Sequence, residues 1–341
     1  INIEFQGGEP LLNFETLKFI TEYALELNKT ENRDLEISLI SNFSLLDDEK
    51  INFLLNYKIG ICTSFDGPRL VHKKNRIFSK GDSYKIIVKN VRKLRKKYEY
   101  LTSSHTKRLN ALSTITKFSL LYPRQIVDEY IDLDFPAVHL KLLNPFGFAK
   151  MTWKRIGYTP EEFLKFYKKA LNYIISLNLK GKTFYERTTV IFLKKILTDS
   201  DPNYLELRSP CGAGIGQLAY NYNGDVYTCD EGRMLSEMGD ELVKLGSVKE
   251  NNYSDIVGHE VVKSLCYASC LDNLPYCSSC AYKPYCGTCP IYNYVDTGNI
   301  FAQMPNSNLC KINMGILDYL FDKLKDRRIK KIFQKWIKTE Y

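Results

Sequence analysis

The crowding of the cysteines constrains this chain more than any other feature of its sequence. Nine of the ten cysteines lie between residues 211 and 310, and only Cys62 precedes them in the 341-residue chain. Two Cys-x2-Cys pairs, at 277–280 and 286–289, are separated by only five residues. Such a pair places two thiolates on one tight turn, which suits a soft metal or an iron–sulfur cluster. We therefore expect a cysteine-poor body followed by a metal-binding module.

The alternatives to an iron–sulfur module are zinc and disulfides. Two pairs this close do not match a zinc ribbon, whose pairs lie roughly 15–20 residues apart. A globular composition, with 44% hydrophobic residues, does not resemble a small secreted disulfide scaffold. Two iron–sulfur clusters are therefore favoured, with zinc as the main rival. The four histidines show no metal-ligand spacing and are expected to be structural or exposed: His72, His105, His139 and His259.

The net charge of +9 is spread along helical faces. Basic residues at 85–98 and 330–338 alternate with apolar residues at helical spacing, which is typical of a solvated helix face. An acidic peptide segment is a simple partner for such faces, whereas neither nucleic acid nor a membrane is predicted as a partner. No signal peptide is visible, and no apolar run reaches the roughly 18 residues that span a bilayer. A cytoplasmic location is expected.

The first 200 residues alternate between short β-branched runs and amphipathic stretches. Strands are predicted at 1–5, 35–40, 59–65, 109–116 and 137–143, and helices near 14–28, 47–57, 83–98, 122–132, 160–178 and 184–198. This alternation predicts an α/β fold with parallel βαβ units. Five strands are too few for a closed eight-stranded barrel, but they suit an open partial barrel that has lost its first strand.

The pattern changes near residue 205. Alternating runs at 217–222 and 225–229 flank Asn223-Gly224, which predicts a β-hairpin with a type I′ turn. The segment at 266–310 is rich in Cys, Pro, Tyr and Gly and is expected to bury little apolar area. Its fold therefore needs a cross-link, such as a metal centre, to stabilise it. A helix is predicted from about residue 312.

Three motifs carry a resemblance to a known family. Gln-Gly-Gly-Glu-Pro at 6–10, Ser-Phe-Asp-Gly-Pro at 64–68 and the pattern C…G-x4-C…C-x2-C-x5-C…C occur in this order. Together they resemble radical SAM enzymes that carry a SPASM domain. The longer strings at 5–12, 209–220 and 225–234 resemble the His-Xaa-Ser system radical SAM maturase, the HxsB family, and the likeness runs to about residue 322.

The resemblance implies a domain organisation. A partial (β/α)6 radical SAM barrel without its first strand would occupy 1–200. A SPASM domain with a β-hairpin and a C-terminal helix would occupy 201–322, and a basic helical tail 323–341. The family's C-x3-C-x2-C triad, which binds the cluster that cleaves S-adenosylmethionine, is absent. We expect an N-terminally truncated chain that is inactive alone, with a degenerate non-catalytic relative as the alternative. A triad encoded within about 40 residues upstream of Ile1 would decide between them.

The resemblance also implies binding residues. The Gly pair would permit close backbone approach to the methionyl amino group of S-adenosylmethionine, and the Glu carboxylate would pair with that ammonium. Other residues at strand ends would face the ribose or the substrate. The implied cofactor-binding residues are Gly7, Gly8, Glu9, Pro10, Ser41, Asn42, Ser64 and Asp66. The catalytic residues stay unknown, because the ligands of the radical-generating cluster are absent.

The cysteines would hold two auxiliary 4Fe–4S clusters. The resemblance implies an outer cluster on Cys277, Cys280, Cys286 and Cys310 and an inner cluster on Cys211, Cys229 and Cys289. The inner cluster then lacks a fourth ligand. Either Cys266 or Cys270 supplies it, or that position is open to substrate. The last pair is Cys-x2-Cys where the family has Cys-x3-Cys, which leaves the partner assignment of Cys289 open.

The implied function is maturation of a ribosomally made peptide through a 5′-deoxyadenosyl radical. The cofactors would be S-adenosylmethionine, the two auxiliary clusters and a third 4Fe–4S cluster in the full-length protein. The partners would be a precursor peptide with His-Xaa-Ser repeats, a second radical SAM maturase of the same system, and a one-electron donor such as flavodoxin or ferredoxin. The alternatives are a non-catalytic iron–sulfur scaffold or peptide-binding partner, and an enzyme like the sulfatase maturases.

Overall fold

The computed structural model describes residues 1–101, 109–301 and 303–339, and the predicted histidine position 105 lies outside them. The described chain divides into two compact units. Unit 1 comprises residues 1–142 and 169–188, and unit 2 comprises residues 143–168 and 189–339.

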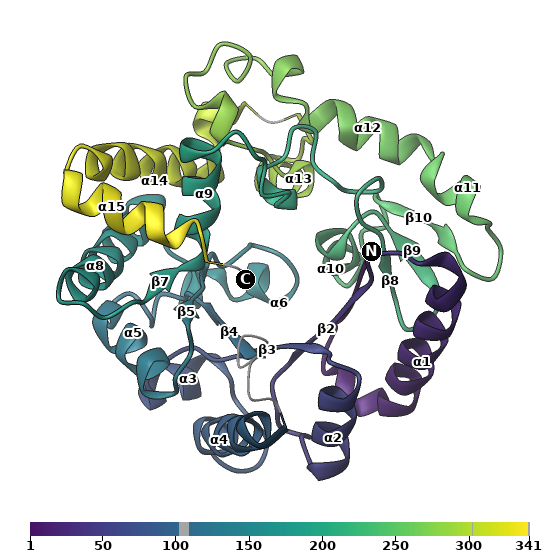
Figure 1. Ribbon diagram of the computed structural model, residues 1–341. Coiled ribbons are helices and arrows are strands. Elements are labelled where there is room, and N and C mark those ends of the chain that lie inside the picture. The colour runs from purple at the N-terminus through teal and green to yellow at the C-terminus, as the bar shows by residue number, and fades with distance from the viewer. Residues whose placement is uncertain (102–108, 302, 340–341) are drawn as a thin grey trace. The chain divides into compact units, whose positions relative to one another are not determined.

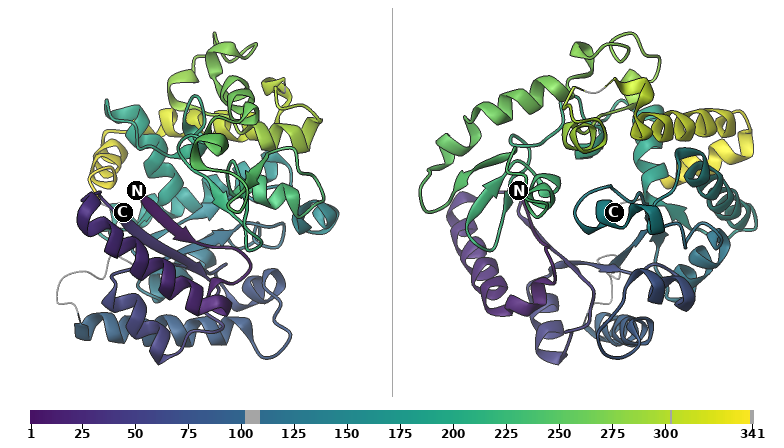
Figure 2. Two further views of the ribbon diagram at one scale, coloured as in Figure 1. Left: turned by 90° about the vertical axis from the view of Figure 1, so that its right-hand side faces the viewer. Right: turned by 180° about the vertical axis from the view of Figure 1, so that it is seen from behind.

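Unit 1 is built on a five-stranded sheet whose strands follow chain order, and every neighbouring pair is parallel. Right-handed crossovers between such strands place all the connecting helices on one face of the sheet. The views in Figures 1 and 2 agree that the purple and blue helices lie on one face of these strands. The strands are β1 (Asn2–Phe5), β2 (Glu36–Ser41), β3 (Gly60–Ser64), β4 (Leu109–Thr114) and β6 (Leu140–Lys141).

The strands β2, β3 and β4 of this sheet bury alternate side chains, as a half-covered sheet requires. In β2 the buried residues are Ile37, Leu39 and Ser41, and β3 and β4 show the same period of two. The positions between them are only half-buried. The prediction of parallel βαβ units is therefore confirmed.

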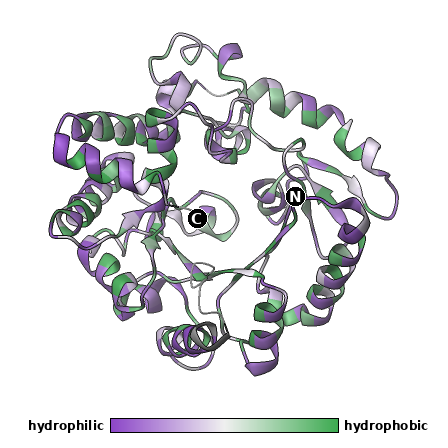
Figure 3. Ribbon diagram, in the orientation of Figure 1, coloured by the Kyte–Doolittle hydropathy of each residue, from purple (hydrophilic) through white to green (hydrophobic). Residues whose placement is uncertain are grey.

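The helices of unit 1 are amphipathic. In α4, Ile87, Val91 and Leu94 are fully buried, whereas Lys85 and Lys89 are exposed. Figure 3 shows both colours along the helices of this unit. The helical elements are η1 (Pro10–Asn13), α1 (Phe14–Glu31), α2 (Asp48–Asn56), α3 (Arg69–Asn75), α4 (Ser83–Leu101), α5 (Pro123–Asp132) and the second half of α8 (Pro160–Leu179).

The predicted strand at 137–143 is two strands in different sheets. β5 (Ala137–Val138) pairs with β7 (Tyr185–Glu186), while β6 pairs with β4. The predicted helix at 184–198 correspondingly starts later, as α9 (Arg187–Leu197). The reason lies in Glu186, whose buried carboxylate accepts hydrogen bonds from the backbone N–H groups of Leu140 and Thr188 at 3.2 and 3.1 Å. This carboxylate links the two short strands to the start of α9.

Unit 2 consists of short elements joined by long loops. Its elements are α6 (Phe148–Met151), α7 (Trp153–Ile156), the first half of α8, most of α9, η3 (Leu205–Leu207), β8 (Ala219–Tyr220), β9 (Asp225–Tyr227), α10 (Asp230–Ser236), β10 (Lys244–Ser247), α11 (Tyr253–Val257), α12 (Glu260–Ser269), η4 (Leu271–Asn273), η5 (Lys283–Tyr285), α13 (Pro290–Thr297), η6 (Met304–Asn306), α14 (Asn308–Leu324) and α15 (Arg327–Trp336).

The predicted hairpin is present, but its turn differs from the prediction. β8 and β9 are antiparallel, and β10 adds a third strand that sequence reasoning missed. Of the Asn223-Gly224 pair only Gly224 has a positive φ, of 94°, so the turn is not type I′. Gly224 N–H donates to the Asn221 carbonyl at 3.0 Å, which places Tyr222 and Asn223 at the centre of the turn. The glycine occupies the left-handed position that follows a type I turn.

The C-terminal region forms two helices. α14 begins at Asn308, slightly before the predicted position, and α15 carries the basic residues of the predicted tail. Phe333 and Trp336 of α15 are buried with their ring centroids 5.1 Å apart. Among the described residues no helix is both long and apolar enough to cross a membrane. The domain boundaries at 200 and 322, the partial barrel and the SPASM domain stay predictions.

Candidate functional site

The Gly-Gly-Glu turn directly after β1 leaves its backbone open to solvent. Gly7 and Gly8 are both exposed, and a Cβ atom at either position would meet nothing within 4 Å. Gly7 has a φ of 137°, in the region that favours glycine. The turn can therefore accept close approach of a ligand to its main chain.

The Glu9 carboxylate joins this turn to the end of β2. Its Oε1 accepts hydrogen bonds from the backbone N–H of Leu11 at 3.1 Å and the hydroxyl of Ser41 at 2.8 Å. Its Oε2 accepts from the backbone N–H of Asn42 at 2.9 Å. Glu9 thereby caps the short helix η1, in which Pro10 is the first residue. The carboxylate is fixed before any ligand arrives.

Half-buried Glu9 still has capacity to bind a cation. A carboxylate offers about four acceptor positions, and three of them are filled by the bonds described above. The remaining position is on Oε2, which among the described residues accepts a hydrogen bond only from Asn42. An exposed glycine backbone beside a preorganised carboxylate can accept a cationic ligand group.

The other residues predicted on this side lie at neighbouring strand ends. Ser41 is buried at the end of β2, where its hydroxyl also accepts from the backbone N–H of Phe43 at 3.0 Å. Asn42 follows it, and its side-chain oxygen accepts from Ser44 N–H at 2.8 Å. Ser64 is half-buried at the end of β3, one strand further along the sheet. The structure therefore brings Glu9, Ser41 and Asn42 into direct contact and places Ser64 on the next strand.

Asp66 has a different environment from the one predicted. It is fully buried, and its Oδ1 accepts from the backbone N–H of Thr114 at 3.0 Å. Arg76 forms an ion pair with it, with Nε 2.9 Å from Oδ2. These contacts tie the end of β3 to the end of β4 and to the end of α3. The geometry favours a structural role for Asp66 over contact with ribose or substrate.

Sequence reasoning missed the two residues that surround Asp66. His72 accepts a hydrogen bond at Nδ1 from the backbone N–H of Asp66 at 3.2 Å, and Arg76 lies one helical turn further on. Burial lowers the pKa of His72 to about 4, against the opposing effect of Asp66. A His-x3-Arg pair that follows an Asp-Gly-Pro turn after three intervening residues is the sequence signal that could have identified this cluster.

Gly67 shows why the turn after Asp66 needs glycine. Its φ is 90°, and a Cβ atom there would lie 2.8 Å from Cγ1 of Ile126. A side chain at this position would therefore be strained and would also collide with α5.

Four of the predicted cluster cysteines gather in one part of unit 2. Cys277, Cys286 and Cys310 pack against an apolar cluster of Leu271, Leu274 and Met304. Burial, followed by the neighbouring thiols Cys310, Cys286 and Cys280, raises the pKa of Cys277 to about 11. Burial and then Cys286 and Cys280 do the same for Cys310. The four thiols that the resemblance assigns to the outer cluster therefore lie close enough to interact electrostatically.

The three cysteines assigned to the inner cluster gather in a second group. Cys211 and Cys229 belong to one buried cluster, and Cys289 packs against it. Burial raises the pKa of Cys229 well above its usual value, helped by Glu231 and then Cys289. Two of these thiols cap helices, because Cys229 Sγ accepts from Gly232 N–H and Cys289 Sγ from Tyr292 N–H, each at 3.4 Å.

The backbone between the two groups is closely packed. A Cβ atom at Gly287 would lie 2.6 Å from the Glu206 carbonyl oxygen and from Cα of Leu207. Glycine is therefore required within the second Cys-x2-Cys pair, where η3 passes.

The two extra cysteines lie at the end of α12. Cys211 N–H donates to the hydroxyl of Ser269 at 3.0 Å, and Leu271 N–H donates to that of Ser209 at 2.9 Å. These bonds hold the segment around Cys211 against the last turn of α12. Burial and the Cys211 thiol raise the pKa of Cys266, so these two thiols are neighbours. Cys270 caps the C-terminus of the same helix.

All ten cysteines are free thiols. Among the described residues, no three His, Cys, Asp or Glu side chains converge tightly enough to hold a single metal ion. The thiols instead form looser groups of four and of three.

Comparison with known proteins finds relatives that are radical SAM enzymes. A cysteine-type anaerobic sulfatase-maturating enzyme of Clostridium perfringens is 27% identical over 76% of this chain and 67% of its own length. A second such enzyme from the same species is 28% identical, but the match covers 58% of its length. The radical SAM cyclopropyl synthase TigE of Paramaledivibacter caminithermalis is 30% identical over 30% of this chain and 20% of its own. No family model matches the chain.

Solved structures give the same result for the fold. The structure of native anSMEcpe with bound AdoMet aligns with a TM-score of 0.75 at 20% identity, covering 98% of this chain and 85% of that one. The structure of Streptococcus suis SuiB bound to precursor peptide SuiA aligns with a TM-score of 0.60 at 13% identity, covering 88% and 63%. The relatives and structural neighbours of this chain are radical SAM maturases. The mixed α/β fold with a parallel sheet matches theirs.

Proposed function

We propose that this chain is a radical SAM enzyme with two auxiliary 4Fe–4S clusters that modifies a ribosomally made peptide. The separation of seven cysteines into a group of four and a group of three carries the proposal. A cysteine-rich domain with a purely structural role does not need two groups of free thiols. The ligands of an iron–sulfur cluster, in contrast, must not be joined in disulfides. The peptide substrate is supported by the homologues and by neighbours solved with peptides.

S-adenosylmethionine is assigned to the turn after β1. The exposed Gly7 and Gly8 backbone would lie against its methionyl group, and the free acceptor position of Glu9 would take its ammonium. Ser41 and the backbone of Asn42 hold the carboxylate in that orientation. Pro10 starts the helix that Glu9 caps, and Ser64 is assigned to the ribose or substrate side. When bound, the cofactor would supply a 5′-deoxyadenosyl radical on one-electron reductive cleavage by a 4Fe–4S cluster whose C-x3-C-x2-C ligands this sequence does not contain.

The clusters are assigned to the two thiol groups. Cys277, Cys280, Cys286 and Cys310 would hold the outer one, and Cys211, Cys229 and Cys289 the inner one. For the fourth inner ligand we choose Cys266 over Cys270. The hydrogen bonds from Cys211 and Leu271 fix α12 beside the inner group, and the Cys266 thiol interacts electrostatically with that of Cys211.

Iron content tests the cluster assignment directly. Anaerobically reconstituted protein is expected to hold about eight irons, and replacing Cys277 and Cys280 together with Ala should remove about half of them. In the protein that lacks Cys277 and Cys280, and so keeps only the inner cluster, Cys266→Ala should alter the spectrum or the iron content. Cys270→Ala is the matched control and should alter neither. Protein that binds zinc and no iron would refute the assignment.

The substrate proposal is a precursor peptide with His-Xaa-Ser repeats, processed with a partner radical SAM maturase of the same system and a flavodoxin or ferredoxin as electron donor. The long strings at 5–12, 209–220 and 225–234 support it. The second candidate is maturation of a cysteine-type sulfatase, which the two Clostridium perfringens relatives favour.

Binding separates the two candidates without requiring turnover. Labelled peptides containing His-Xaa-Ser repeats and a cysteine-type sulfatase sequence would be titrated against the reconstituted protein. Preference for the repeat peptide supports the first candidate, and preference for the sulfatase peptide supports the second. If neither peptide binds although the protein holds about eight irons, the alternative of a non-catalytic iron–sulfur scaffold remains.

A further inference from the structure

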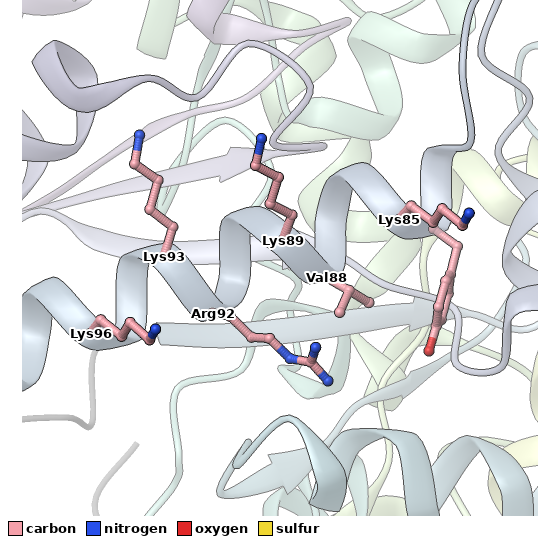
Figure 4. Close-up of a pocket in the computed structure, with 7 residues that line it drawn as sticks. Lys85, Val88, Lys89, Arg92, Lys93 and Lys96 are labelled. Carbon is pink, nitrogen blue, oxygen red and sulfur yellow. The ribbon is translucent and has the colours of Figure 1, made fainter.

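Helix α4 carries a basic groove that neither the turn after β1 nor the thiol groups account for. A depression of about 500 Å³ runs along its outer side, lined by Tyr84, Lys85, Val88, Lys89, Arg92, Lys93 and Lys96. We call these seven residues the α4 groove. Figure 4 shows Lys89 and Lys93 on one side of the helix and Arg92 and Lys96 on the other.

Most cations of the α4 groove have no acidic partner. Lys93 forms an ion pair with Asp48 at 2.8 Å. Within the described part of the chain, no ion pair is found for Lys85, Lys89, Arg92 or Lys96, and all four are exposed. Like charges at successive helical turns repel one another, so such a row costs stability unless an anion neutralises it. An anionic partner would remove that cost.

The remaining faces of α4 limit what the partner can be. The apolar residues Ile87, Val91 and Leu94 are fully buried, so the helix has no apolar face to insert into a membrane. Tyr84 is only half-buried, but its hydroxyl donates to Glu129 at 2.7 Å. The groove therefore lacks the row of free aromatic rings on which single-stranded nucleic acid stacks.

The spacing of the cations matches an extended polypeptide. Residues four apart on a helix are separated by about 6 Å along its axis, and the two rows of cations, Lys85–Lys89–Lys93 and Arg92–Lys96, together span about 16 Å. In an extended chain, side chains on one face recur about every 6.7 Å. A segment of about five residues with acidic side chains at alternate positions would therefore place its carboxylates beside successive cations.

We propose that the α4 groove binds an acidic, extended segment of a polypeptide. The inference rests on the proposed function, because a peptide-modifying enzyme must hold its substrate polypeptide beyond the residue it alters. Exposed ion pairs contribute little individually, so this contact is weak, sensitive to salt and useful mainly for capture and orientation.

The test uses fluorescence anisotropy with the reconstituted protein at about 30 mM salt, where screening is slight. The probe is a labelled octapeptide of alternating Glu and Ser, compared with a peptide of the same composition whose Glu residues are consecutive. The test variant is Lys89→Glu with Arg92→Glu. The matched control is Lys330→Glu with Lys331→Glu on α15, which changes net charge equally at two exposed positions.

The alternating peptide is expected to bind more tightly than the block peptide. The α4 variant should weaken it at least ~10-fold and the α15 control less than ~3-fold. Equal losses would show a response to net charge alone and overturn the proposal. So would tighter, α4-dependent binding of oligothymidylate or of phosphatidylserine vesicles. The variants' iron content is measured in parallel, so that a failure here is distinguishable from a failure of the proposed function.

Discussion

The turn at Gly7–Glu9 and the two cysteine groups are held in place by different means. The Glu9 carboxylate accepts three hydrogen bonds from residues at neighbouring strand ends of a parallel sheet. The outer thiols instead rest on a small apolar cluster of three buried residues, Leu271, Leu274 and Met304. The first site is complete as a folded structure, whereas the second needs its clusters to offset the entropy of ordering its loops.

Removal of iron should therefore affect the two regions unequally, and this is the largest effect we expect. Chelation under anaerobic conditions should lower hydrogen-exchange protection across 270–310 at least ~100-fold while leaving β2 and β3 protected, because cluster binding energy is folding energy there. Hydrogen exchange with mass spectrometry measures both regions in one sample. Equal loss in both, or none in either, would contradict the comparison.

Glu9→Ala should cost about 3 kcal/mol of unfolding free energy in the sheet unit. The substitution leaves the buried hydroxyl of Ser41 and two backbone N–H groups without their acceptor. Urea denaturation, followed by a probe in unit 1, measures the loss. Glu31→Ala, at an exposed position, is the control and should cost about 0.5 kcal/mol or less. Similar losses for both variants would show that the carboxylate does not hold the turn.

Gly67→Ala should cost about 2 kcal/mol, since it combines a positive φ with a collision against Ile126. Gly7→Ala is a useful comparison because its φ is also positive but its surroundings are open. It should cost about 1 kcal/mol, so the difference between the two variants measures the collision. The outcome that counts against this account is a larger loss for Gly7→Ala.

A further effect concerns pH. The folded-state pKa of His72 is lowered to about 4, so the unfolded chain takes up this proton first as pH falls. Its contribution to stability is complete above the unfolded pKa and is lost toward the folded one. From about pH 7 to about pH 5 the loss should be about 2 kcal/mol. His72→Gln should flatten this part of the stability profile, and an unchanged slope would exclude His72 as its source.

The sheet could be predicted from sequence because its signals are local. The β-branched runs and the amphipathic helices between them correspond to β1–β4 and their helices. The region at 137–143 could not, since its division into β5 and β6 depends on Glu186, more than 40 residues later in the chain. The strand β10, which adds to the hairpin, could not be predicted either. It lies in a charged segment, and its pairing depends on β9.

The candidate site was predictable to a similar extent. The spacing of the cysteines and the resemblance indicated which thiols group together, and Gly-Gly-Glu indicated the turn. The hydrogen bonds from Ser41 and Asn42 to Glu9 were not predictable, because they join residues 32 and 33 positions apart. Asp66 was assigned to a ligand because its motif says nothing of its burial or of its contacts with Arg76 and Thr114.

The two thiol groups are interleaved along the chain. Cys289 of the inner group lies between Cys286 and Cys310 of the outer group, while Cys211 and Cys229 come well before both. No single cut in the sequence separates one group from the other. Neither can therefore be gained, lost or exchanged by recombination as a separate cassette, and a ribosome must synthesise the chain through Cys289 before the inner set is complete. The two groups are inherited together, as one unit.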